Sequence, residues 1–306
     1  MIRYAVRRCA AMPLTLLVII TLSFFIMRLA PGGPFDAEQG MAPEIKANLQ
    51  AAYGLDQPLP VQYARYLRGL LRGEFGPSFK LRDVSVSELI ARGFPISATL
   101  GVAALSAALL LGVPLGLGAA LRRDAWPDHA ATALSSFALA VPGFVVGPFL
   151  ALVFGVHMHW LPVAGWQPDL RHLLLPVVTL ALPAIAHVAR LTRGGLLEVL
   201  RADYVRTARA KGLSEAQVIL RHALRPALLP VVSFLGPAIA AIVTGSLVVE
   251  TVFGLPGTGR YLVEGAINRD YTLVMGMVIV YGAVTLLANL GADLLYGWLD
   301  PRVRHE

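Results

Sequence analysis

Apolar residues in this 306-residue chain are gathered into long stretches that contain no Asp, Glu, Lys or Arg. An α-helix rises about 1.5 Å per residue and the apolar core of a bilayer is about 30 Å thick, so about 20 such residues span it. Each stretch can hold one span. The stretches are 9–27, 93–121, 129–168, 172–189, 226–249 and 271–292. The pattern therefore predicts an all-α membrane protein with six transmembrane helices.

The stretch 129–168 is long enough for two spans, but its second half carries polar and turn-forming residues. His157, His159, Pro162 and the turn at 165–166 indicate an end in water, so we expect one span there. Glycines four residues apart, at Gly112 and Gly116 and again in segment 143–147, favour close helix packing in lipid.

Composition supports the membrane class. The chain is 56% hydrophobic and 15% charged, whereas soluble domains carry charge at about a quarter of their positions. Core helices of a soluble protein are the alternative, but nothing else in the chain could cover six apolar faces. Cys9 is the only cysteine, which excludes an intrachain disulfide or a cysteine-based metal site. Arg28 and Pro31 disfavour cleavage of a signal peptide, so we expect an uncleaved first span.

The net charge of +7 is placed as a topology signal rather than as a nucleic-acid surface. Basic residues are concentrated in segments 3–8, 122–123, 190–225 and 302–304, which lie on one side if the chain crosses six times. Cytoplasmic segments carry such an excess of Lys and Arg. We therefore expect both termini in the cytoplasm and no nucleic-acid partner.

We expect four regions along the chain. Residues 1–29 are the N-terminal segment and first span, and residues 30–94 are an extracytoplasmic loop. The remaining spans lie in 95–298, and 299–306 form a cytoplasmic tail. The loop contains two amphipathic patterns, one from about Pro43 to Gly54 and one after Pro58, each beginning at proline.

The segment 198–225 between the fourth and fifth spans reads as two short amphipathic helices. Gly212 stands where a helix ends in the left-handed conformation, and Ser214 with Gln217 forms a capping box. The expected apolar stripes contain Leu197, Leu200, Tyr204 and Ala208 in the first helix, then Ala216, Ile219, Leu220, Ala223 and Leu224 in the second. Such an element suits docking into a soluble partner; a helix lying on anionic lipid is the alternative.

This segment also carries a resemblance. Residues 204–215 read YVRTARAKGLSE and residues 221–230 read RHALRPALLP, which resembles the "EAA" loop of ABC importer permeases, in particular the peptide-import branch. RLAPGGPF at 28–35, FGPSF at 75–79, ETVFGLPGTG at 250–259, NRDY at 268–271 and LDPR at 299–302 are similar to the same branch. The resemblance covers essentially the whole chain.

The resemblance implies a type I ABC importer permease fold in the bacterial inner membrane, with oligopeptides as substrate; dipeptides, nickel or other small solutes are alternatives. The implied partners are a homologous second permease, two ATP-binding subunits and an extracytoplasmic peptide-binding protein. ATP and Mg would bind the partner subunits, and this chain would hold no cofactor or metal and no catalytic residue. The residues implied in coupling to the ATPase are Tyr204, Arg206, Thr207, Ala208, Arg209, Lys211, Gly212, Ser214, Arg221 and His222.

The residues themselves agree that energy comes from elsewhere. A phosphate-binding P-loop requires Gly directly before its Lys. Lys46, Lys80 and Lys211 are the only lysines, and they follow Ile, Phe and Ala. A secondary transporter would carry ionisable groups at mid-membrane, and none lies near a span centre here. No protease signature occurs either.

Weak candidates for a substrate pathway are Asn289, Asp293 and Glu250. Asn289 and Asp293 are four residues apart and so share a helix face. Hydrogen bonding between helices is an equal alternative for both. The segment 253–259 is either a plain turn or a loop that approaches the pathway.

Overall fold

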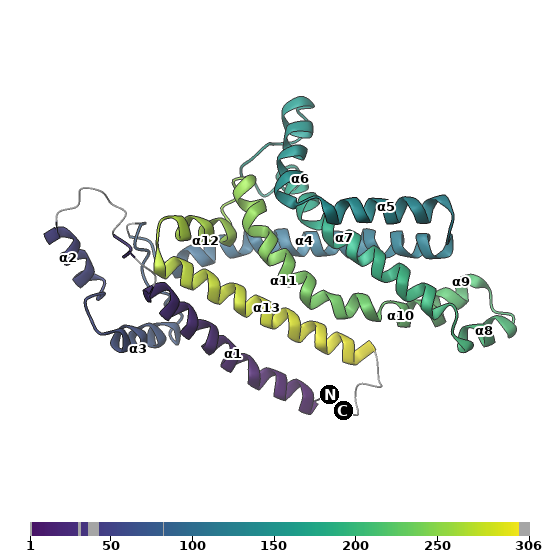
Figure 1. Ribbon diagram of the computed structural model, residues 1–306, viewed down its shortest axis with the longest axis horizontal. Helices are drawn as coiled ribbons and strands as arrows, with labels where there is room; N and C mark the ends of the chain where they lie inside the picture. The colour runs from purple at the N-terminus through teal and green to yellow at the C-terminus, as the bar shows by residue number, and fades with distance from the viewer. Residues whose placement is uncertain (1, 30–31, 36–42, 82, 300–306) are drawn as a thin grey trace. The chain divides into compact units, whose positions relative to one another are not determined.

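The computed structural model describes residues 2–29, 32–35, 43–81 and 83–299, and regular structure in them is helical apart from one isolated bridge between Pro77 and Ser85. Most of the predicted tail 299–306 therefore lies outside the described residues. The helices (Figure 1) are α1 Ile2–Leu29, α2 Pro43–Ala52, α3 Leu59–Leu70, α4 Val86–Leu121, α5 Trp126–Ala140, α6 Gly143–Leu150, the π-helix η1 Ala151–His157, α7 Leu170–Val199, α8 Asp203–Ala210, α9 Glu215–Gln217, the π-helix η2 Val218–Ala223, α10 Leu224–Ala227, α11 Leu229–Val252, α12 Thr258–Ile267 and α13 Tyr271–Leu299.

In the part of the chain that the structure describes, five helices are long and apolar enough to cross a membrane: Arg8–Leu29, Val86–Leu121, Leu170–Val199, Leu229–Val252 and Tyr271–Gly297. The stretch predicted as one span forms two helices, Trp126–Ala140 and Gly143–His157, with a bend of 101° between them. The bend lies at Val141, which is extended, with φ −92° and ψ 119°. A residue before proline is driven out of the helical region, and Pro142 follows here. The described residues hold six candidate spans if the bent pair counts as one.

The chain divides into two compact units. The first contains residues up to 10, 98–255 and from 284 onward; the second contains 11–97 and 256–283. Helix α4 begins at Val86, nine residues inside the segment expected as loop. The four regions expected from the sequence stay a prediction.

Helix α7 is central to the first unit and packs against α5, α6, α10 and α11. A Cβ at Gly112 would lie 2.8 Å from the Cβ of Val188, and one at Gly116 would meet the carbonyl oxygen of Ala189. These two glycines therefore let α4 and α7 approach closely, as their spacing predicts. Within segment 143–147 a Cβ at the first glycine would meet open space, whereas one at Gly147 would lie 3.3 Å from the ring of Phe253, so only Gly147 allows a close approach.

The two short helices expected in the external segment are present in the second unit as α2 and α3. Helix α3 packs on the outer end of α1, where the hydroxyls of Tyr63 and Thr21 are 2.6 Å apart. Phe24 is fully buried, with its ring centroid 5.2 Å from that of Tyr63 and 6.1 Å from that of Tyr66.

A buried carboxylate joins two of the motifs noted in the sequence. Asp270 of NRDY is 1% exposed and accepts hydrogen bonds from the hydroxyl of Ser78 and the backbone N–H of Phe79, both in FGPSF. Its other oxygen accepts the backbone N–H of Leu273 at 3.2 Å, which caps the start of α13. The second unit is therefore fastened by a contact between residues about 190 positions apart.

Candidate functional site

Helices α8, α9, η2 and α10 form a hairpin, residues 203–227, at one end of the first unit (Figure 1). Gly212 has φ +77°, which confirms the left-handed turn. The Ser214 hydroxyl accepts the backbone N–H of Gln217, and the Gln217 side chain accepts the N–H of Ser214, which confirms the capping box. Both signals are local, and the chain obeys them where they occur.

The side chains buried in the hairpin differ in part from the expected stripes. Val205, Ala208 and Val218 form its core and are at most 5% exposed, whereas Tyr204 is 47% and Leu220 65% exposed. The cause in the second arm is the π-helix Val218–Ala223, which spaces facing residues about five apart rather than four. Within the expected second stripe, Ala223 is buried, Ile219 and Leu224 are half-buried, and Ala216 and Leu220 are exposed, so apolar side chains are left on the outer surface.

Polar candidates in the hairpin are mostly exposed. Arg209 donates to both carboxylate oxygens of Glu215, at 2.7 and 3.2 Å, which links the arms across the turn. This hydrogen bond lowers the pKa of the Glu215 carboxyl and raises that of Arg209. The Thr207 hydroxyl donates to the carbonyl of Asp203 at 2.9 Å. The remaining polar candidates are exposed Arg206, Lys211 and Arg221 and half-buried His222. Ala208 is a core residue of the hairpin and presents no surface.

The hairpin is held on the helix bundle by a close backbone contact between α7 and α10. A Cβ at Gly195 of α7 would overlap the carbonyl oxygen of Ala227 in α10. Around this point Leu196, Ala223 and Ala227 are fully buried and pack with Ala120. Because the backbones of α7 and α10 touch here, a displacement of the hairpin moves both helices.

An ion pair that sequence reasoning missed lies in the same unit. Arg193 of α7 donates to Asp128 in the first turn of α5 through Nε, at 2.5 Å, and Nη2, at 2.7 Å. The Asp128 side chain is 1% exposed. The two residues are 65 positions apart, so no local pattern could pair them.

The pathway candidates are all engaged within the chain. Glu250 is fully buried near the end of α11. Asn289 lies against the backbone of Gly236, and Asp293 pairs with Arg8 at 3.0 Å. The interhelical alternative therefore has direct contacts in its favour for Asn289 and Asp293.

The two histidines near η1 interact with backbone carbonyls rather than with each other. His157 Nδ1 is 3.1 Å from the oxygen of Leu152, and His159 Nδ1 is 3.2 Å from that of Gly155. Within the described residues, no three His, Cys, Asp or Glu side chains gather as a metal site would require.

The bundle of candidate spans with a helical hairpin at one end has the fold of a solved ABC importer. A solved structure of the MetNI methionine ABC transporter, in inward-facing conformations, shares this fold. Its TM-score is 0.59, with 18% identity, over 69% of this chain and 96% of that chain.

Residues 112–305 match the family of binding-protein-dependent transport system inner membrane components, and residues 1–101 match the N-terminal model of the same membrane components. The chain belongs to this family: it is a multi-pass inner membrane permease subunit and not an enzyme. It is 49% identical to the oligopeptide transport system permease protein OppB of Escherichia coli K12 over 306 residues, all of both chains. It is 43% identical to the dipeptide transport system permease protein DppB of Bacillus subtilis 168 over 304 residues, 99% of this chain and 98% of that protein.

Proposed function

We propose that this chain is a permease subunit of an ATP-driven oligopeptide importer and forms half of the translocation pathway. Support comes from full-length identity of 49% to an oligopeptide permease protein. Identity of 43% to a dipeptide permease protein supports dipeptides as the second candidate substrate. The partners are a homologous permease, two ATP-binding subunits and an extracytoplasmic peptide-binding protein. ATP and Mg are bound by the ATP-binding subunits, and both termini of this chain lie in the cytoplasm.

In this proposal the hairpin 203–227 docks on an ATP-binding subunit. The observation that carries it is the exposure of Tyr204 and Leu220 on an otherwise charged, internally braced element. Exposed apolar side chains on such an element favour a protein partner. The hairpin also exposes the cations Arg206, Lys211 and Arg221, which would meet acidic groups of that partner.

Force then passes from the ATP-binding subunit into the bundle through known contacts. Closure of the two ATP-binding subunits moves the hairpin, and the backbone contact of Gly195 with Ala227 transmits this motion to α7 and α10. Because the hairpin core and the capping box keep it rigid, displacement is not absorbed locally. Peptide crosses the membrane as the cavity between the two permeases switches between its inward-facing and outward-facing states.

Cysteine cross-linking tests the docking directly. A Cys9→Ser chain has no cysteine, so single cysteines can be placed at Leu220, which is 65% exposed, and at buried Val205. Leu170→Cys, 83% exposed at the opposite end of α7, is the matched control. With a short bismaleimide, we expect a cross-link to an ATP-binding subunit carrying one engineered cysteine from position 220 alone. A cross-link from position 170 instead, or the absence of a cross-link from position 220 in an active complex, would refute the docking.

Transport by the reconstituted complex tests the substrate. Proteoliposomes containing this chain and its co-purified subunits should accumulate radiolabelled tetrapeptide when ATP and the binding protein are supplied. Accumulation of dipeptide alone would favour the second candidate, and uptake driven by an ion gradient without ATP would overturn the proposal.

A further inference from the structure

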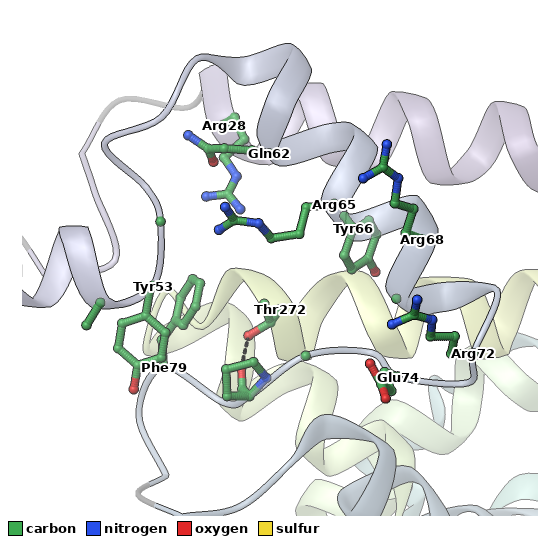
Figure 2. Close-up of a pocket in the computed structure, with 15 residues that line it drawn as sticks. Arg28, Tyr53, Gln62, Arg65, Tyr66, Arg68, Arg72, Glu74, Phe79 and Thr272 are labelled. Carbon is green, nitrogen blue, oxygen red and sulfur yellow. Dashed lines mark hydrogen bonds between the residues drawn. The ribbon is translucent and has the colours of Figure 1, made fainter.

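A pocket of about 530 Å³ in the second unit is strongly cationic (Figure 2). Four guanidinium groups line it, from Arg28 of α1, Arg65 and Arg68 of α3, and Arg72 just after α3, against the single carboxylate of Glu74. Figure 2 shows Tyr66 between the arginines on α3. Like charges gathered around a cavity are held together at a cost in free energy unless an anion joins them.

Two buried donors of the pocket lack acceptors. Within the described residues, neither Arg28 Nε nor the Tyr66 hydroxyl has a hydrogen-bond partner. The Arg28 guanidinium is held over the rings of Phe24 and Tyr271, at 5.2 and 5.7 Å from their centroids. Burial raises the pKa of Tyr66, so its hydroxyl stays a donor at neutral pH. A buried donor without an acceptor costs about 1–3 kcal/mol, so the pocket favours a ligand that accepts hydrogen bonds.

The remaining arginines have the chemistry of a phosphate site. Arg65 donates to the side chain of Gln57 at 2.7 Å. In the part of the chain that the structure describes, Arg68 and Arg72 form no ion pair or hydrogen bond through their side chains, and Arg68 is exposed beside the pocket. A guanidinium presents a planar fork of N–H groups that matches phosphate oxygens in pairs.

The pocket lies at the level of the membrane surface. Arg28 is in the last turn of the candidate span Arg8–Leu29, so we expect it at a membrane surface, where lipid phosphates lie. Phospholipid phosphate is therefore the anion present at the mouth of the pocket in every membrane.

We propose that this pocket binds the phosphate group of an anionic phospholipid. The lipid would join α3 to the end of α1 and neutralise the arginine cluster. This site is separate from the hairpin and does not depend on the transported substrate.

Lipid titration of the purified, delipidated full complex, followed by native mass spectrometry, tests the proposal. The pocket variant is Arg68→Gln/Arg72→Gln. The control is Arg92→Gln/Arg171→Gln, which removes the same charge from two exposed arginines outside the pocket. We expect phosphatidylglycerol to bind the wild type about tenfold more tightly than phosphatidylcholine. The pocket variant should lose about this factor, equivalent to one charge-assisted hydrogen bond, and the control should keep it.

Two further measurements, displacement by inorganic phosphate and capture of the binding protein, test the other possible ligands of the pocket. Displacement of phosphatidylglycerol by an equal concentration of inorganic phosphate would identify a free-anion site and overturn the proposal. The proposal would also be overturned if the pocket variant kept its lipid affinity but captured the extracytoplasmic binding protein more weakly. The arginines would then serve protein docking. Equal affinity of the wild type for the two phospholipids would refute it as well.

Discussion

Arg193 of α7 and Asp128 of α5 form a two-pronged ion pair in which the carboxylate is 1% exposed. The backbone N–H of Asp124 donates a third hydrogen bond to Asp128, at 3.0 Å. A carboxylate withdrawn from water is tolerated only while its partners remain. The pair therefore fixes the start of α5 against α7, one of the most extensive helix contacts in the first unit.

Asp128→Asn should destabilise the chain because it leaves the Arg193 guanidinium without its counter-charge. We expect a loss of about 3 kcal/mol, at the lower end for breaking a buried pair. Thermal unfolding of the purified complex measures it. Asp124→Asn is the matched control, since the Asp124 side chain is 75% exposed, pairs with Arg123, and hydrogen-bonds to Asp128 only through its backbone N–H. Equal melting temperatures for the two variants would contradict the assignment.

Neighbouring glycines in α7 allow a second test. Gly195 has the carbonyl of Ala227 directly over its α-carbon, whereas Gly194 faces open space. Gly195→Ala must push α10 away and should cost about 1–3 kcal/mol, as overpacking does. Gly194→Ala should be neutral or stabilising by up to about 1 kcal/mol, because alanine favours helix.

Peptide-stimulated ATP hydrolysis should separate the same two variants. Gly195→Ala is expected to reduce the stimulation because the hairpin is no longer seated on α7, while Gly194→Ala keeps it. Both quantities, the melting temperature and the ATPase stimulation, can be measured on one preparation. If the two variants had the same values of both, the contact of Gly195 with Ala227 would not carry the coupling.

Asp270 provides a test in the second unit. Both of its oxygens accept hydrogen bonds, one from Ser78 and Phe79 and the other from Leu273. In Asp270→Asn, an NH₂ group replaces one of the two oxygens and must face hydrogen-bond donors. We therefore expect the free energy of unfolding to fall by about 2 kcal/mol, the cost of an unsatisfied buried donor. Limited proteolysis of segment 43–81 should become faster. Asp56→Asn, at an exposed position, should leave the rate unchanged.

Sequence reasoning succeeded where the deciding forces are local. Gly212 and Ser214 act on residues within one or two turns, and both behave as predicted. It failed where the deciding contact is distant: the partners of Asp128 and Asp270 are 65 and about 190 residues away. NRDY and FGPSF could be recognised as motifs, but nothing in either indicates that one binds the other.

Helix register is the other limit. A period of 3.6 residues places Leu220 and Ala223 on one stripe, whereas the π-helix Val218–Ala223 buries Val218 and Ala223 and leaves Leu220 exposed. The bend at Val141 could have been predicted from Pro142, which follows it, but the unbroken apolar stretch suggested a single span. The proposed docking surface depends on this register, so the exposure of its residues was predicted only in part.

The chain on its own should not hydrolyse ATP. Its lysines are Lys46, Lys80 and Lys211, and none follows a glycine as the lysine of a P-loop does. Phosphate release by the purified single chain should match the buffer blank, and ATP-binding subunits added back should restore it. Hydrolysis that persists after further purification would refute the division of labour.

Gly212 allows the sharpest test of coupling. Its φ of +77° is open to glycine and tolerated by asparagine, but for other L-residues it costs about 1–2 kcal/mol. Because a Cβ at this position meets no atom within 4 Å, substitution changes the backbone and adds no clash. Gly212→Val should therefore open the hairpin turn and abolish peptide-dependent ATP hydrolysis while membrane insertion remains normal. Gly212→Asn should retain most of the activity. If valine and asparagine reduced the activity equally, side-chain contact with the partner rather than backbone conformation would be the cause, and the rigid-hairpin mechanism would fail.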